Sequence, residues 1–411
     1  MIRRVAANYA FRSLFRHTRR TLLSVVGVGV GVAIALFSAS WVRGAIRMEI
    51  RAAVESGAGH LRIVPTAWLD KRENSLRLSH PDEDYEAARS LRYAQVVAPR
   101  ARTNGLLAFG NRSAGVEMIG VEPEAEGRLS RIVQRAEIEG RYLEASDAGK
   151  VVIGKDLAER LDVLLDDELY VTLSGADGMQ GAMFIIVGLV ETGSEDIDST
   201  FCHVTLDTLN EVTGYSGPGE ITILLTDYKH LTAAQRQLAR RVPPGDTVLT
   251  WKDINPSYAA GIESDRAFTK ILIGIIILVV ALGIAAAQLA AVLERRRELA
   301  ILSALGMKGR QVISLIVLEA LAIGLGGMVV AVLVGGSGAY YLASHGVDLE
   351  ALMGGDASFG AVLLDPVVYG DFGFWLIWYA LVIAEVATVG ASIYPAWMAV
   401  RIDPADALRT I

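Results

Sequence analysis

The segment LERRRELAILSALGMKGRQVISLIVLEALAIGLGG, residues 293–327, places three consecutive arginines between two long apolar stretches. The stretch before it, ILIGIIILVVALGIAAAQLAAVL at residues 271–293, has 23 residues and no charge. That length is enough to cross a hydrocarbon core of about 30 Å at about 1.5 Å per residue. The arginines mark the membrane boundary, so the segment predicts a short charged connection between two membrane spans.

Three further apolar segments are long enough to span a membrane. The chain of 411 residues is 52% hydrophobic and has a mean hydropathy of +0.38, which is typical of a membrane protein. The N-terminal apolar segment lies between Arg20 and Arg43 and contains 22 uncharged residues. We predict four spans, at residues 21–43, 270–293, 311–342 and 372–400.

The charges between the spans predict their orientation. Residues 1–20 contain six arginines and no acidic residue, and residues 294–310 are also rich in arginine and lysine. Residues 343–371 contain five acidic residues and no lysine or arginine. The positive-inside rule therefore places both termini and residues 294–310 in the cytoplasm, and residues 343–371 outside.

The 44–269 segment then lies on the outer side, and its pattern predicts one large α+β domain inserted between spans one and two. Turn residues bound eight short apolar runs, which we interpret as strands beginning near residues 61, 104, 115, 150, 169, 183, 201 and 221. Helical spacing occurs at residues 81–91, 155–164, 206–212 and 232–242, with Asp207 and Thr232 as predicted N-caps. Residues 257–269 predict a helix that continues into span two.

Short cytoplasmic helices are predicted at three places. Residues 1–20 have an apolar and an arginine-rich face, typical of a helix in the membrane interface. In residues 294–310, Leu299, Leu302 and Leu305 repeat every three residues before Gly306, where a left-handed cap would end a helix. In residues 401–411, Asp403 is positioned to cap a helix that begins at Pro404, after Pro395 has bent or ended span four.

Two carboxylates fall inside the predicted spans. Glu319 lies near the start of span three and Glu385 near the middle of span four. Each costs on the order of 3 kcal/mol if it faces lipid, so we expect both to face protein or water. For Glu385 two roles stay open, a proton relay and a hydrogen bond within the helix bundle.

No pattern predicts catalysis or a metal site. The sequence has no H-E-x-x-H, no G-x-S-x-G and no G-x-x-x-x-G-K-[ST]. The adjacent Cys202 and His203 are too few ligands for a closed site and point to opposite faces of a strand. We therefore expect no catalytic residue, no metal and no cofactor bound by this chain, and no nucleic-acid partner.

Two motifs resemble the FtsX/MacB-type permeases of ABC transporters. The family pattern E-R-R-x-E-[IL]-[AG]-[IL]-L-x-A-L-G is matched at residues 294–306, and is followed by Arg310 and by Leu318, Glu319 and Ala320. The pattern Y-P-A-x-x-A-x-x-x-[DN]-P-x-x-A-L-R is matched at residues 394–409. With the large outer domain after span one, the resemblance covers essentially the whole chain.

The resemblance implies a bacterial inner-membrane permease whose ATPase is a separate subunit. A dimer of that ATPase would bind ATP and Mg²⁺, and a second copy or a paralogous permease would complete the membrane part. The segment after span two would be a coupling helix that contacts the ATPase, and the C-terminal motif a second cytoplasmic contact. The residues implied are Arg296, Arg297, Glu298, Leu299, Leu302, Leu305 and Gly306 in the coupling helix, and Tyr394, Pro395, Asp403, Pro404 and Arg409 in the C-terminal motif.

The organisation is most similar to that of lipoprotein-releasing permeases, which implies mechanical work on lipoproteins or lipids, with a lipoprotein or a periplasmic carrier as possible partner. One difference concerns a proline-containing hook that such permeases can carry between two strands. Here only GADGMQGA, residues 175–182, joins the corresponding strands. Two alternatives remain: an FtsX-like regulator that activates cell-wall hydrolases without transport, and a MacB-like efflux permease.

Overall fold

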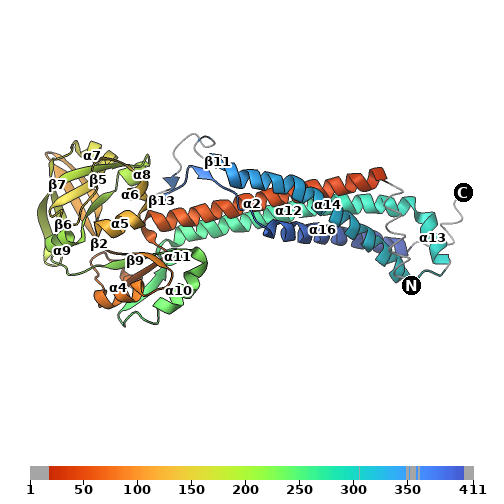
Figure 1. Ribbon diagram of the computed structural model, residues 1–411, viewed down its shortest axis with the longest axis horizontal. Coiled ribbons are helices and arrows are strands. Elements are labelled where there is room, and N and C mark those ends of the chain that lie inside the picture. Colours follow the sequence, from red (N-terminus) through yellow and green to blue (C-terminus); the bar gives the residue numbers. More distant parts are fainter. Residues whose placement is uncertain (1–17, 305, 349–350, 352–357, 360–361, 402–411) are drawn as a thin grey trace. The chain divides into compact units, whose positions relative to one another are not determined.

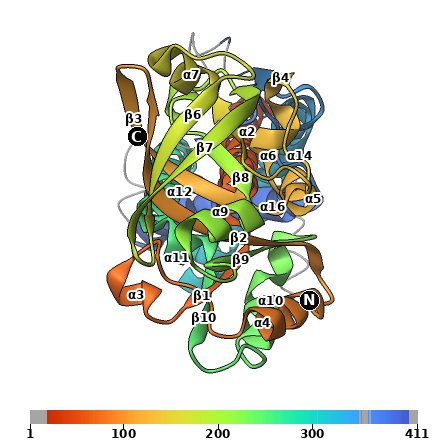
Figure 2. The ribbon, with the colours of Figure 1, turned by 90° about the vertical axis from the view of Figure 1, so that its left-hand side faces the viewer.

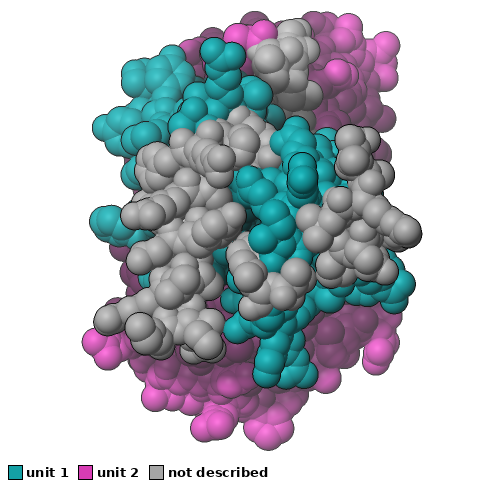
Figure 3. All heavy atoms as spheres, turned by 90° about the vertical axis from the view of Figure 1, so that its right-hand side faces the viewer, with its two compact units in different colours: residues 1–46, 263–347, 367–411 teal, residues 47–262, 348–366 magenta. Residues whose placement is uncertain are grey.

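The computed structural model describes residues 18–304, 306–348, 351, 358–359 and 362–401 (Figure 1). The chain divides into two compact units, coloured separately in Figure 3. We call residues 1–46, 263–347 and 367–411 the helical unit, and residues 47–262 and 348–366 the β-rich unit. The chain passes between them four times: within the helices α2 (Thr18–Ala53) and α12 (Pro256–Glu294), and at residues 347–348 and 366–367.

Four helices have the length and apolar composition needed to span a membrane. They confirm the four predicted spans, although two extend well beyond the apolar segments. Helix α12 begins at Pro256, so the helix predicted at residues 257–269 does continue into span two. The four are α2 (Thr18–Ala53), α12 (Pro256–Glu294), α14 (Gly309–His345) and α16 (Trp375–Val400).

The helical unit is held together by an apolar cluster and by close helix approaches at glycines. Val28, Leu36, Ala331 and Ala384 are buried in the cluster that α2, α14 and α16 share. A Cβ at Gly335 would lie 2.7 Å from the backbone of Ala33, so only glycine permits this α2–α14 contact. Glycine thus allows close packing of α2 and α14 within the chain.

The β-rich unit contains a ten-stranded sheet with the order β10-β1-β9-β2-β3-β8-β5-β7-β4, while β6 pairs with both β2 and β7. All eight predicted strands are present. The short strands β4 and β10 were not predicted from the sequence pattern. The strands are β1 (Leu61–Pro65), β2 (Ala94–Phe109), β3 (Arg112–Val121), β4 (Glu137–Gly140), β5 (Lys150–Gly154), β6 (Glu168–Gly175), β7 (Gly178–Glu191), β8 (Cys202–Thr205), β9 (Glu220–Leu225) and β10 (Asp246–Thr250).

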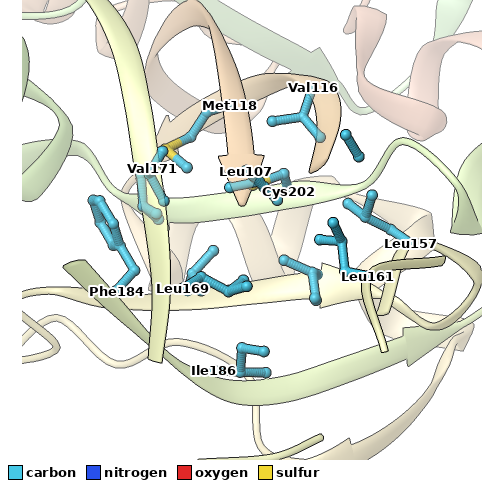
Figure 4. Packing of buried hydrophobic residues seen from close by; sticks show 14 of the residues in the cluster. Leu107, Val116, Met118, Leu157, Leu161, Leu169, Val171, Phe184, Ile186 and Cys202 are labelled. Atoms are coloured by element: carbon cyan, nitrogen blue, oxygen red, sulfur yellow. The ribbon is translucent and has the colours of Figure 1, made fainter. Parts of the chain in front are cut away.

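The pairing of β6 with both β2 and β7 closes a ring of six strands, β2-β3-β8-β5-β7-β6. Strands β6 and β7 of this ring lie in the upper half of Figure 2. Alternate residues of β6 point into the ring, where Leu169 and Val171 are fully buried and the intervening Tyr170 is exposed. Inside, they meet Leu107, Phe184 and other apolar side chains (Figure 4). The first half of β2 leaves the ring and pairs with β9, so one long strand connects both parts of the sheet.

Short helices cover the sheet. Two predicted N-caps are wrong by two residues, because Thr205 caps α9 through the backbone nitrogen of Thr208, and α10 begins after His230. The helices are η1 (Val54–Ala58), α3 (Trp68–Lys71), α4 (Pro81–Arg89), α5 (Pro123–Leu129), α6 (Arg131–Arg135), α7 (Lys155–Leu161), α8 (Glu195–Asp198), α9 (Leu206–Thr213), η2 (Tyr228–His230), α10 (Leu231–Leu238) and α11 (Trp251–Ile254).

The connection predicted as a simple loop at residues 343–371 is divided between the units. Residues 348–366 belong to the β-rich unit, so that unit is not built from the 44–269 insertion alone. Leu363 packs against its apolar cluster, and the Leu363 backbone nitrogen donates to the Ser56 hydroxyl at 3.0 Å. The short strands here are β11 (Val347–Asp348), β12 (Ser358–Phe359), β13 (Val362–Leu363) and β14 (Val367–Val368).

The ring core predicts a clear contrast between two leucines three residues apart. Leu161 is fully buried in the core, whereas Leu164 is 73% exposed. Leu161→Ala should lower the free energy of unfolding by about 3 kcal/mol, because it leaves a cavity. Leu164→Ala should change it by less than about 0.5 kcal/mol. Denaturant unfolding of the full chain in detergent measures both, and equal effects would contradict the assignment of the core.

Candidate functional site

The helix after span two is α13 (Arg296–Ala304), which follows α12 with a single residue between them. The side chains of Arg296, Arg297 and Glu298 are exposed, and Ile301 is 45% exposed. These four residues, which we call the coupling face, combine charge with one apolar side chain. That combination suits docking to another protein.

The structure corrects the prediction for Leu299. Only 7% of its surface is exposed, because it packs in a cluster formed by the ends of three helices, so it is a core residue rather than a docking contact. The side chain of Leu302 and the whole of Leu305 lie outside the described residues. The other members of the cluster are Val292, Val312, Ile316, Ala396 and Ala399.

The turn after α13 has the backbone expected from the sequence. Gly306 has φ +96°, a region that side-chain-bearing residues rarely adopt. The Lys308 backbone nitrogen donates to Oε1 of Gln311 at 2.7 Å, which satisfies an otherwise open group at the start of α14. Beside the turn, Arg295, the residue between α12 and α13, lies 3.5 Å from Glu319 of α14, so the first carboxylate inside the spans forms an ion pair.

The C-terminal motif lies partly outside the described residues, which end at Arg401; Asp403, Pro404 and Arg409 fall beyond them. Pro395 does not end span four, because α16 continues to Val400. Tyr394 is 56% exposed, and the Arg401 guanidinium lies 3.9 Å from the centre of the Trp397 ring.

In the β-rich unit, a group of buried charges holds the end of α2. The helix passes into the π-turn η1, where Gly57 has φ +127°. The Gly57 carbonyl accepts hydrogen bonds from Arg100 at 2.6 Å and from Arg62 at 2.9 Å. The last carbonyls of a helix carry partial negative charge and have no partner within the helix, so two guanidinium groups satisfy them well.

Glutamates on other elements hold these arginines in turn. Glu126 of α5 accepts two hydrogen bonds from Arg100, both 2.7 Å, and Glu220 of β9 accepts one from Arg62 at 2.9 Å. Arg102 bridges Glu220 and Glu117. We call these six residues the charge cluster: Arg62, Arg100, Arg102, Glu117, Glu126 and Glu220.

The charge cluster is self-neutralising, with three arginines and three glutamates. Burial favours the neutral acid, but the charges of Arg102 and Arg62 outweigh it and hold the pKa of Glu220 at about 2. The pKa of Glu126 is likewise lowered, because Arg100 outweighs its burial. Glu126 and Glu220 are therefore ionised at neutral pH, and removing an arginine beside either would leave it buried without its counter-ion.

Sequence reasoning missed the charge cluster. A signal was present, because Arg62 interrupts the apolar run LRIVP and Arg100 and Arg102 alternate with apolar residues in β2. The partners could not be identified, since Arg62 and Glu220 are 158 residues apart.

A second set of charges ties residues 348–366 into the β-rich unit. Asp365 accepts hydrogen bonds from Arg131 and from Arg135, the latter at 2.6 Å. Arg131 also lies 3.8 Å from Glu55 in η1. Burial raises the pKa of Asp365, but the two arginines outweigh that effect and lower it. The connection between α14 and α16 is thus fastened beside the end of α2 within this unit.

The β-rich unit contains a cavity and two further polar groups outside the charge cluster. A cavity of about 360 Å³ lies between α4, α5 and β2, with Tyr85, Arg89 and Arg128 in its wall. Cys202 is buried in the ring, and the His203 Nδ1 lies 2.8 Å from the Tyr142 hydroxyl. In the part of the chain that the structure describes, no three metal-ligating side chains gather.

Two family models match the chain. The model of the MacB-like periplasmic core domain matches residues 21–241, more than half of the chain, and that of the FtsX-like permease C-terminal matches residues 270–404. The chain belongs to the FtsX/MacB permease family. It is thus an ABC transporter permease with four membrane helices, as the two motifs predicted.

Relatives of this permease carry two kinds of name. The lipoprotein-releasing system transmembrane protein LolC of Xylella fastidiosa (strain 9a5c) is 25% identical over 95% of this chain and 93% of its own length. The macrolide export ATP-binding/permease protein MacB of Campylobacter jejuni is 23% identical over 76% of this chain, but over only 50% of its own length. The periplasmic region of MacB from Actinobacillus actinomycetemcomitans is 18% identical, with a TM-score of 0.36, over 49% of this chain and 94% of that structure.

The permease joins β6 and β7 by a tight turn. Gly175 pairs with Gly178, so only Ala176 and Asp177 lie between the strands. The place where the sequence lacks a proline-containing hook is therefore a simple hairpin.

The charge cluster predicts a strong effect of Arg100→Met. The substitution leaves Glu126 buried without its cation and the Gly57 carbonyl without one donor. The free energy of unfolding should therefore fall by about 3–5 kcal/mol. Arg112→Met is the matched control, since Arg112 pairs with Asp162 at an exposed site and should contribute at most about 1 kcal/mol. Thermal unfolding of the full-length protein compares them. A small effect of Arg100→Met would mean that the charge cluster does not hold the end of α2.

Proposed function

We propose that this permease couples ATP hydrolysis by a separate ATPase to the extraction of lipoproteins from the outer face of the bacterial inner membrane. The observation that carries the proposal is end-to-end similarity to a lipoprotein-releasing transmembrane protein, over 95% of this chain and 93% of that relative. MacB relatives extend far beyond the match and are named as ATP-binding proteins. This sequence contains no G-x-x-x-x-G-K-[ST], so the nucleotide must be bound elsewhere.

The proposed topology places both termini and the coupling face in the cytoplasm and the β-rich unit outside. It rests on the six arginines before span one and on the acidic residues 343–371. The coupling face then meets a dimer of the ATPase, and a second copy or a paralogous permease completes the membrane part. The proposed contacts with the ATPase are Arg296, Arg297, Glu298 and Ile301. Leu299 is not among them, because it is buried.

Two helices, α2 and α12, continue from the apolar segments into the residues of the β-rich unit, which supports the proposal that motion is transmitted along them. Helix α2 ends in the π-turn whose carbonyls Arg62 and Arg100 hold, and α12 runs without interruption from Pro256 to Glu294. Movement of α2 would therefore displace a backbone carbonyl that is hydrogen-bonded to two side chains of the β-rich unit. The cost of breaking buried ion pairs favours movement of the unit as a whole.

The hairpin of β6 and β7 bears on whether a soluble carrier binds at this position. A chain without a hook at this position has no obvious projection for a soluble lipoprotein carrier. We propose extraction of the lipid anchor itself, with any carrier binding elsewhere. A MacB-like export function is the second candidate, favoured by the 23% identity to MacB over 76% of this chain.

The coupling face predicts the loss of ATPase association without loss of folding. Glu298→Lys combined with Ile301→Asp should reduce the co-purified ATPase by about tenfold or more, a loss of at least about 1.4 kcal/mol. The matched control is Glu159→Lys with Leu164→Asp, which makes the same chemical changes at exposed sites of the β-rich unit. Undiminished association in the coupling-face variant would refute the docking site.

Extraction predicts selective release of acylated protein. Proteoliposomes containing the permease, its ATPase and a fluorescent lipoprotein should lose the lipoprotein from the membrane when ATP is added. The same protein anchored by a transmembrane helix should stay, because pulling about 20 apolar residues from lipid costs far more than removing acyl chains. ATP-dependent movement of small amphiphiles without lipoprotein release would favour the export function instead.

A further inference from the structure

The second carboxylate inside the spans, Glu385, has no partner among the residues that the structure describes. Both of its carboxylate oxygens are inaccessible to solvent and neither makes a hydrogen bond. The group lies at the interface of α14 and α16, against Gly324. A Cβ at Gly324 would lie 3.0 Å from the Glu385 Oε1 and 2.7 Å from the Thr388 hydroxyl oxygen. The two helices therefore leave room for a carboxyl group but supply no cation.

The sequence offers no neutralising charge at this depth. Apart from Glu385, residues 21–42, 271–293, 320–344 and 375–400 contain no aspartate, glutamate, lysine, arginine or histidine. Arg295, at the end of α12, lies 3.5 Å from Glu319. A second copy of this chain would bring only another Glu385 to the same level of the membrane.

A neighbouring element also presents an unpartnered polar group. Gln288 of α12 is 7% exposed, and its Nε2 makes no hydrogen bond to a described residue. It lies on the same helix face as Ile284 and Val292, which pack in the apolar clusters of the helical unit. This amide and the Glu385 carboxyl do not meet in the arrangement described. Gln288 and Glu385 are thus among the buried polar side chains of the helical unit that make no hydrogen bond to a described residue.

The protonation state of Glu385 follows from these contacts. An ionised carboxylate buried without a counter-ion or a donor is strongly disfavoured, and a group in this position normally becomes neutral. A carboxylic acid loses the net charge, and its hydroxyl can donate to a nearby carbonyl as Thr388 does to the Ala384 carbonyl at 2.8 Å. We propose that Glu385 is a proton-binding site of the helical unit, which holds its proton while α14 and α16 are packed and exchanges it when that contact opens.

Glu319 is the natural internal control. Both carboxylates lie in membrane-spanning helices, yet Glu319 has a cation within 3.5 Å and Glu385 has none among the described residues. The proposal therefore requires Glu385 to be a carboxylic acid and Glu319 a carboxylate in the same molecule. It is independent of the substrate and of the ATPase contact.

Infrared spectroscopy tests the proposal on the full chain in native membranes with its partners. The carbonyl band of a protonated carboxylic acid should be present at neutral pH, should be lost in Glu385→Gln and should remain in Glu319→Gln. Because glutamine resembles the neutral acid in shape and charge, Glu385→Gln should assemble as the unsubstituted protein does. Dicyclohexylcarbodiimide, which reacts with protonated carboxyls in membranes, should label Glu385 and not Glu319, as read by mass spectrometry of the peptides.

An unchanged band in Glu385→Gln overturns the proposal, whether or not the carbodiimide reacts. In that case the carboxylate is ionised, and its cation is not one of the residues that the structure describes. Loss of assembly in Glu385→Gln together with normal assembly of Glu385→Asp would also overturn the proposal. Aspartate can still pair with a cation and glutamine cannot, so this result would indicate an ionised carboxylate with a charged partner.

Discussion

The structure depends on one contact, the carbonyl of Gly57 held between Arg62 and Arg100. A helix that leaves the membrane must end somewhere, and its last carbonyls need donors. Here the donors are two buried guanidinium groups, each fixed by a glutamate from a separate element, Glu220 or Glu126. The contact joins α2 to β1, β2, α5 and β9 at once. Such an arrangement fixes the position of the end of α2 but adds little net stability, because desolvation offsets much of the attraction between buried charges.

The same rule governs the charges of the helical unit. Arg295 and Glu319 satisfy each other between α12 and α14, near the charged connection that contains α13. Glu385 has no such partner among the described residues and is accommodated by a glycine and by neutrality. A charged group in a low-dielectric interior is therefore either paired with an opposite charge or neutralised by a proton. The pair of Arg295 and Glu319 holds two segments together, whereas Glu385 can change its protonation state.

Much of the fold could be predicted from the sequence because local patterns encode it. The four spans follow from uncharged runs of membrane length, and the eight predicted strands from short apolar runs between turn residues. A helix is present where the leucine spacing predicted one, at Arg296–Ala304, yet Leu299 was assigned to the wrong face. A leucine row predicts an apolar surface but not whether α14 and α16 or another protein covers it. The charge cluster and the fastening of Asp365 by Arg131 join residues far apart in sequence, so no local pattern could reveal them.

The most direct test of the central claim is to purify the permease from its native membrane in mild detergent and to identify its stoichiometric partners by mass spectrometry. The account predicts an ABC ATPase as a dimer, a second copy or a paralogous permease, and bound lipoprotein. Purification without any ATPase would contradict the assignment of the coupling face and the transmission mechanism. An ATPase accompanied by a cell-wall hydrolase, with no lipoprotein, would instead make the protein a transmembrane regulator and exclude extraction as its function.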